Sequence, residues 1–157
     1  MTKLSIPFQI LTLTILLCTL TYTTLCYAHD FEGNLTAQAG AGATDLFSIS
    51  CSNAEENATE TTHHLYVTIR NNVKSNDPLS VVVYKKGDSN GLSKSVSDAI
   101  GGDYTPSPGL LLPGGNGDYL VFVHHNSDTP LTYLLQYHCQ DSNNQHTGTD
   151  IQSLQNE

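Results

Sequence analysis

Apolar and polar residues alternate along much of the chain between residues 45 and 139, with the period of two that is typical of β-strands. The segments DLFSISC (45–51), HHLYVTIRNNV (63–73) and LSVVVYKK (79–86) show this pattern, and turns rich in Asn, Asp and Gly separate them. About six to eight short strands without an amphipathic helix are typical of a sandwich. The pattern therefore predicts an all-β fold, a single antiparallel β-sandwich of the jelly-roll or immunoglobulin-like kind.

The clearest element is a hairpin near the end of this region. YLVFVHH (119–125) and LTYLLQYHC (131–139) are joined by the turn sequence NSDTP. Cys139 is in phase with the apolar face of the second strand, and Cys51 is in phase with the apolar face of its own strand. Both cysteines are therefore expected to point into the core.

An apolar segment opens the chain and changes the compartment that we expect. Lys3 precedes the run ILTLTILLCTL, and Ala28 offers a small residue for cleavage, so residues 1–28 are predicted to be a signal peptide. The run is short for a membrane span, although an uncleaved anchor and a second cut at AQA (37–39) are alternatives. A secreted protein, periplasmic or extracellular, without stable membrane association is expected.

Three further segments follow from composition. Residues 29–44 contain GNLTAQAGAGAT, which indicates a flexible lead-in or a poor edge strand. Residues 45–139 carry the β-sandwich domain. Residues 140–157 are polar and lack an apolar period, so they are predicted to be a disordered tail.

Cleavage after Ala28 would leave two of the four cysteines, Cys51 and Cys139. In an exported protein, two cysteines predict one disulfide. It would close a loop of about 90 residues, worth about 4–5 kcal/mol in the chain-entropy model. A free thiol is the alternative, but no partner residues for a cysteine nucleophile are evident.

The charge of the chain excludes one class of partner. The net charge is −9, with 15 acidic residues against 6 basic ones. Such a surface repels nucleic-acid phosphates and anionic lipid. Nucleic-acid binding is therefore set aside, and an unidentified protein or glycan is the expected partner. Tyr66, Tyr84 and Tyr104 are candidates for an aromatic binding face.

The hairpin region also carries a family resemblance. Gly117, Tyr119, Val121 and Val123, followed by a Tyr-x-Leu strand, resemble the end of the bacterial pre-peptidase C-terminal domain family. The resemblance covers about residues 45–139. It implies a non-catalytic β-sandwich of secreted bacterial proteins, here without an accompanying protease.

Seven histidines lie after residue 28, and the first of them suggests a metal site. If cleavage leaves His29 at the N-terminus, its amino nitrogen and ring nitrogen can chelate one ion. A second histidine would complete a planar three-nitrogen site, which suits Cu(II). His124 or His125 is the expected second ligand, with His63 or His64 as the alternative.

Other interpretations of the histidines remain open. Neighbouring residues on a strand point to opposite faces, so neither adjacent pair is expected to bind one ion without a bulge. Mixed histidines could hold zinc instead, or the histidines could have no ligand role. Asp and Asn in the turns could bind calcium, but the geometry of tight turns explains them better.

No motif for hydrolytic or phosphate chemistry occurs, so no catalytic residue is expected. The sequence predicts a secreted, non-catalytic binding or accessory module with an unknown ligand. An exported copper-binding protein that uses His29 is the alternative.

Overall fold

The computed structural model describes residues 29–53 and 61–157, so the predicted signal peptide lies outside the described residues. These ranges form β-strands and one short 3-10 helix, η1 (Ala37–Ala39). The strands are β1 (His29–Leu35), β2 (Thr44–Ser52), β3 (His64–Asn71), β4 (Leu79–Lys85), β5 (Ser93–Asp98), β6 (Leu110–Pro113), β7 (Gly117–His124), β8 (Leu131–Gln140) and β9 (Gly148–Gln155). Within the described ranges, no helix is long and apolar enough to cross a membrane.

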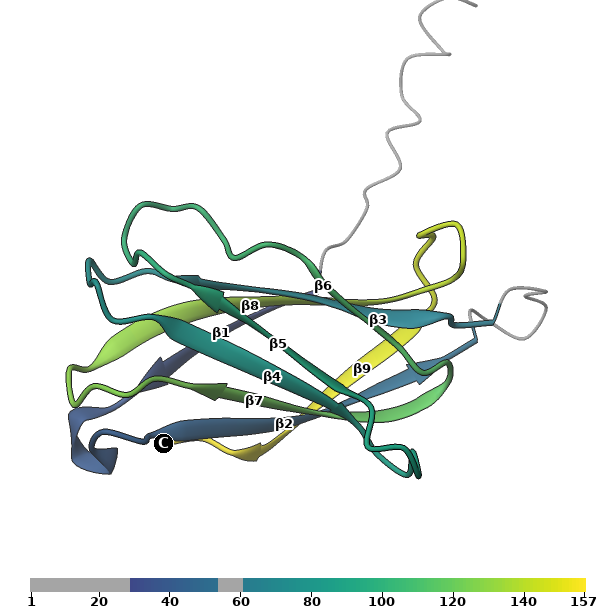
Figure 1. Ribbon diagram of the computed structural model, residues 1–157, viewed down its shortest axis with the longest axis horizontal. Helices are drawn as coiled ribbons and strands as arrows, with labels where there is room; N and C mark the ends of the chain where they lie inside the picture. Colours follow the sequence, from purple (N-terminus) through teal and green to yellow (C-terminus); the bar gives the residue numbers. More distant parts are fainter. Residues whose placement is uncertain (1–28, 54–60) are drawn as a thin grey trace, which may run out of the picture.

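Two antiparallel sheets face each other, as Figure 1 shows. One sheet has the order β1-β8-β3-β6, and the other has the order β5-β4-β7-β2-β9. Strand pairing is nested, because β1 pairs with β8, β2 with β7, β3 with β6 and β4 with β5. This nesting is the strand order of a jelly roll, to which β9 is added beside β2. The predicted antiparallel sandwich is confirmed, in its jelly-roll form.

The core lies between the two sheets and follows the alternation of the sequence. Leu65, Val67 and Ile69 of β3 are fully buried, and so are Val121 and Val123 of β7. Their neighbours along each strand are mostly polar or only half-buried, because successive side chains point to opposite faces. The hydrophobic pattern of each central strand therefore fixes which face it turns inward.

The predicted disulfide is confirmed. Cys51 of β2 and Cys139 of β8 are bonded, with their Cα atoms 5.5 Å apart. Because β2 and β8 belong to different sheets, the bond joins the two layers of the sandwich. Both cysteines are buried in the core, as their phase in the sequence predicted.

Of the two alternatives for residues 29–44, the flexible lead-in is wrong over the first half, where the structure has the edge strand. Residues 29–35 form β1, an edge strand that pairs with β8 along its whole length. Phe31 packs its ring against that of Phe47, with 4.7 Å between the centroids. Gly33 makes room for the ring of Tyr133, which a side chain at this position would meet. The segment is ordered because its few apolar side chains all face the core.

The disordered tail expected at 140–157 is also wrong. After a turn organised by Asp141, whose Oδ1 accepts hydrogen bonds from the backbone N–H groups of Asn143 and Gln145, the chain forms β9 beside β2. Ile151 is paired with Ile49 and packs against the core. Most other side chains of β9 are exposed, which explains why the segment has no apolar period. The folded domain therefore reaches beyond the expected limits of 45 and 139 at both ends.

Removing the disulfide should destabilise the sandwich strongly. The two cysteines are separated by 88 positions. A double Cys51→Ala, Cys139→Ala variant is expected to lose about 4–5 kcal/mol of unfolding free energy, because the unfolded chain regains the entropy of this loop. Urea denaturation of both proteins measures the difference. A loss below about 1 kcal/mol would show that the crosslink does not constrain the unfolded chain in this way.

Candidate functional site

Histidines gather at one end of the four-stranded sheet. His29 begins β1, His64 begins β3, and each lies against the last residues of β8. His138 lies within that end of β8, and His146 forms a bridge with Gln140. Five of the seven histidines are therefore found in this region: His29, His63, His64, His138 and His146.

The other two histidines lie at the opposite end of the sandwich. His124 ends β7, where it pairs with Thr44, and His125 follows it. His29 instead pairs with Tyr137, six residues into β8 from the start of that strand. Six residues of strand span about 20 Å. The expected copper site that joins His29 to His124 or His125 is therefore wrong, because β1 runs antiparallel along β8 and carries His29 away from the turn.

His125 is instead a buried side chain of the connection between β7 and β8. It is 2% exposed, and its Nδ1 has no hydrogen-bond partner. Burial lowers the pKa of His125, while the nearby Asp77 acts in the opposite direction. His125 is therefore a neutral packing residue at the end opposite to His29.

A cluster of aromatic rings surrounds His138, and we call His29, Tyr66, Tyr137, His138 and His146 the histidine–tyrosine cluster. The ring of His138 stacks on that of His146 at 4.5 Å and on that of Tyr66 at 6.0 Å between centroids. The ring of His29 lies 6.1 Å from that of His138 and 5.8 Å from that of Tyr137. Sequence reasoning missed His138 and His146 as site residues, because their contacts depend on the pairing of β1 with β8 and on the bridge between Gln140 and His146.

Burial governs the charge of His138. The side chain is 8% exposed and its Nδ1 has no hydrogen-bond partner. Burial, followed by the neighbouring His146 and His29, lowers the pKa of His138 to about 4, while Asp30 opposes the shift. His138 is therefore neutral near pH 7 and keeps a free lone pair on one ring nitrogen.

The adjacent pair His63 and His64 forms a second arrangement, which we call the histidine pair. The Nδ1 atoms of the two rings lie 3.1 Å apart, and the ring planes are nearly perpendicular at 87°. Nε2 of His64 lies 2.9 Å from Oε1 of Gln140. The expectation that adjacent histidines diverge is wrong here. His63 precedes β3, which begins only at His64, so the alternation of a strand does not apply between them.

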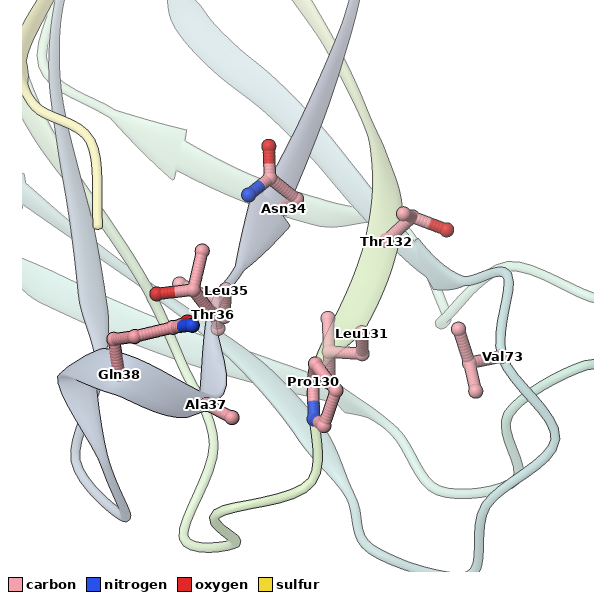
Figure 2. Close-up of a pocket in the computed structure, with 9 residues that line it drawn as sticks. All are labelled: Asn34, Leu35, Thr36, Ala37, Gln38, Val73, Pro130, Leu131 and Thr132. Atoms are coloured by element: carbon pink, nitrogen blue, oxygen red, sulfur yellow. The ribbon is translucent and has the colours of Figure 1, made fainter.

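An apolar groove lies at the other end of the sandwich (Figure 2). It has a volume of about 350 Å³ and is formed by the end of β1 with η1, the start of β8, and Val73 after β3. Leu35 and Leu131 are buried in the core beneath it. No lining residue is charged: they are Asn34, Leu35, Thr36, Ala37, Gln38, Val73, Pro130, Leu131 and Thr132.

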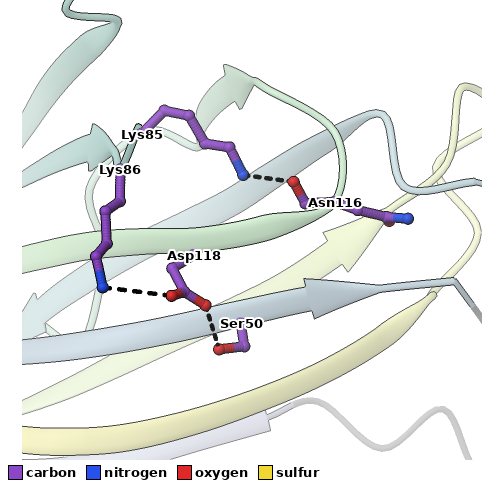
Figure 3. Close-up of polar contacts among 5 residues, drawn as sticks. All are labelled: Ser50, Lys85, Lys86, Asn116 and Asp118. Atoms are coloured by element: carbon purple, nitrogen blue, oxygen red, sulfur yellow. Dashed lines mark hydrogen bonds and ion pairs between the residues drawn. The ribbon is translucent and has the colours of Figure 1, made fainter. Parts of the chain in front are cut away.

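Lysines and an aspartate form a polar network between β2, β4 and β7 (Figure 3). Lys85 is 8% exposed, donates a hydrogen bond of 2.7 Å to the carbonyl of Asn116, and lies 4.0 Å from the ring centroid of Tyr119. Burial lowers the pKa of Lys85. Lys86 pairs with Asp118 at 3.5 Å, and Ser50 donates a hydrogen bond to the same carboxylate. These contacts tie neighbouring strands together and give the network a structural role.

The tyrosines do not form the single aromatic face that the sequence suggested. Tyr66 lies on β3 of one sheet and Tyr84 on β4 of the other. Tyr104 is exposed beyond β5 and lies under the guanidinium of Arg70, at 5.9 Å from the ring centroid. A sugar-stacking platform of these three rings is therefore excluded by the topology.

In the part of the chain that the structure describes, no group of three or more His, Cys, Asp and Glu residues is arranged to hold a metal ion.

Comparisons with known proteins found no sequence match and a distant similarity to a solved structure. No family model matches the chain, so the resemblance to the pre-peptidase C-terminal family stays a prediction. No curated protein matches the sequence either. Among solved structures, the mitogen of Yersinia pseudotuberculosis is similar at a TM-score of 0.46 and 10% identity, over 83% of this chain and 98% of that chain.

The neutral state of His138 should make stability depend on pH. Because its pKa in the folded chain, about 4, is below the ordinary 6.5, the unfolded chain binds the proton more readily between these values. The neutral state of His138 therefore costs no stability above pH 6.5, and the folded chain loses stability as the pH falls toward 4. The unfolding free energy measured by urea denaturation should be about 2 kcal/mol lower at pH 5 than at pH 7 because of this residue.

A His138→Phe variant keeps a ring between Tyr66 and His146 but cannot be protonated, so its loss of stability on acidification should be smaller by this amount. An equal loss in both proteins would contradict the assignment. An NMR titration of the His138 ring with its midpoint near the ordinary histidine value would contradict it as well.

Proposed function

We propose that this protein is an exported, non-enzymatic β-sandwich that acts by binding, and that the apolar groove takes a small uncharged ligand. Export is supported by the apolar segment that precedes His29 and by the disulfide, because disulfides persist in oxidising compartments. The ligand we propose is largely aliphatic and carries a carbonyl or hydroxyl group.

The observation that carries this proposal is the chemistry of the groove lining. Ligand sites are concave and mostly apolar, with a few polar groups that fix orientation. Here Leu35, Val73 and Leu131 supply apolar surface, while the amides of Asn34 and Gln38 can donate and accept hydrogen bonds. A charged ligand would lose its hydration without gaining a partner of opposite charge. A sugar would find no aromatic ring among the lining residues to stack on.

The same lining supports a binding role over catalysis. General acid–base chemistry uses His, Asp, Glu, Lys, Tyr or Cys side chains, and none of these lines the groove. The hydroxyls of Thr36 and Thr132 have no such base among the lining residues to activate them.

NMR titration of the isotopically labelled exported protein tests the groove. The probes are cyclohexanol, cyclohexanone and N-butylacetamide, with cyclohexanecarboxylate as the charged comparison. We expect saturable shifts of the backbone amides of Gln38, Val73 and Thr132 with the uncharged probes and weaker binding of the carboxylate. Val73→Asp should weaken binding at least tenfold, because it puts an unpaired charge in the lining.

Ser95→Asp is the matched control, since it adds the same charge on an exposed position of β5. It should leave the binding of the uncharged probes unchanged. Absence of groove shifts at millimolar probe, or equal binding of the carboxylate, would contradict the proposal.

A second function, copper binding through His29, is favoured by a separate observation. Nδ1 of His29 is buried without a hydrogen-bond partner, and its ring lies 6.1 Å from the neutral ring of His138. If export cleaves the chain after Ala28, the amino nitrogen and Nδ1 of His29 would chelate Cu(II). His138 would then be the nearest further imidazole, in place of His124 or His125.

N-terminal sequencing followed by Cu(II) titration tests this second function. The titration is made in a background where His63 and His64 are replaced by glutamine, so that the histidine pair does not contribute to binding. A chain that starts at His29 should bind one copper ion, and His29→Ala should weaken binding at least tenfold. A chain that starts elsewhere, or unchanged binding in the variant, would exclude this function.

A further inference from the structure

The backbone holds the histidine pair in a fixed position. The N–H of His63 donates a hydrogen bond of 2.7 Å to the carbonyl of Gln140 on β8. The carbonyl of His63 accepts hydrogen bonds from the N–H groups of Gly114 and Gly115, both at 3.2 Å. His64 then begins β3 and pairs with Gln140 on one side and Pro113 on the other. Both Cα positions are therefore set by neighbouring strands before any ligand arrives.

The two rings are spaced as the ligands of one metal ion are spaced. Metal–nitrogen bonds of about 2.0–2.1 Å place two nitrogens about 2.9 Å apart at a right angle and about 3.3 Å apart at the tetrahedral angle. The distance of 3.1 Å between Nδ1 of His63 and Nδ1 of His64 lies between these values. The side chain of His63 is exposed, so its ring is free to make the small rotation that turns both lone pairs toward one point.

A second contact prepares His64 as a ligand. Its Nε2 donates a hydrogen bond of 2.9 Å to Oε1 of Gln140, which leaves the lone pair on Nδ1. A ligating histidine is usually oriented in this way, by a hydrogen bond from its other ring nitrogen. His64 is 6% exposed, so its ring orientation is also fixed by packing.

The proton balance of binding is simple. Without metal, Nδ1–H of His63 donates to the lone pair on Nδ1 of His64. When an ion binds, that proton moves through solvent to Nε2 of the exposed His63 ring, and both rings stay neutral.

The stacked rings of His138 and His146, within the histidine–tyrosine cluster, lack this geometry. An imidazole binds a metal in the plane of its ring. The rings of His138 and His146 are nearly parallel, at 17° and 4.5 Å between centroids, so their lone pairs project side by side without converging. The near-perpendicular rings of the histidine pair, with their nitrogens in contact, differ from this stack in the feature that matters for chelation.

We propose that Nδ1 of His63 and Nδ1 of His64 together bind a borderline divalent metal ion, Zn(II) or Cu(II), at the start of β3. Imidazole nitrogens suit these ions, and Cu(II) binds such ligands more tightly than Zn(II). Solvent fills the other positions on the ion. The site is open and exchangeable, in contrast to closed structural sites with four protein ligands. It is independent of the apolar groove and of any cleavage that would expose His29.

Zinc titration of the exported protein, followed by calorimetry and by NMR of the histidine ring nitrogens, tests the site. We expect one ion to bind in a His29→Ala background and to shift the Nδ1 resonances of His63 and His64 more than their Nε2 resonances. His63→Gln and His64→Gln should each weaken zinc binding at least tenfold. His146→Gln, which removes one imidazole from the histidine–tyrosine cluster, should change the zinc affinity less than twofold.

Gln140 gives a test that keeps both rings in place. Gln140→Glu should tighten zinc binding, because a carboxylate on Nε2–H makes Nδ1 a stronger ligand, and Gln140→Leu should weaken it. Thermal unfolding of each variant confirms that it folds. Zinc affinity that is the same in the wild type, His63→Gln and His64→Gln would overturn the proposal, as would ligation through Nε2 or a failure of Gln140→Leu to weaken binding.

Discussion

The sandwich depends on the way β2 and β8 face each other across the two sheets. Two bonds join these strands, the Cys51–Cys139 disulfide and the buried hydrogen bond from the Tyr133 hydroxyl to Asp45. On each strand the two bonded residues are six positions apart, so the two bonds lie about 20 Å from each other along the interface. Burial raises the pKa of Asp45, although the hydrogen bond from Tyr133 acts in the opposite direction. One bond is covalent and the other is a hydrogen bond. Together they fix the distance between the two sheets and the alignment of β2 with β8.

The position of β8 decides where the histidines lie. β8 has β1 on one side and β3 on the other, so its register with both strands places His29, His64 and His138 at the same end. The start of β8 instead contributes Leu131 and Thr132 to the apolar groove. One strand therefore contributes to two chemically different sites, a group of histidines near its end and a groove with an uncharged lining at its start.

Local patterns in the sequence predicted what depends on local structure. The alternation in β2, β3, β7 and β8 predicted the buried faces, and the phase of Cys51 and Cys139 predicted their disulfide. β9 was missed, and β1 was only the alternative to a flexible lead-in, because both are edge strands that bury few side chains, such as Phe31 and Ile151. Their order comes from pairing with a neighbouring strand, which leaves little trace in the pattern of apolar residues.

The candidate sites were harder to predict because they depend on pairing between distant segments. His138 meets His29 only through the register of β1 with β8, and the sequence left open whether residues 29–44 form a strand at all. The groove combines residues near positions 35, 73 and 131, none of which carries a motif. For His63 and His64 the rule of alternation was applied one residue before the strand begins, so the contact between their rings was not expected.

The disulfide and the histidine pair meet at a single residue of β8. Gln140 follows Cys139, which is bonded to Cys51 of the opposite sheet. The carbonyl of Gln140 holds the N–H of His63, and its side chain holds Nε2 of His64. Two ligating side chains bind a metal ion more tightly when their nitrogens already have the right spacing, because binding then does not have to order the two rings. In this protein the two hydrogen bonds with Gln140 hold the pair in place, and the crosslink between the sheets lies one residue away.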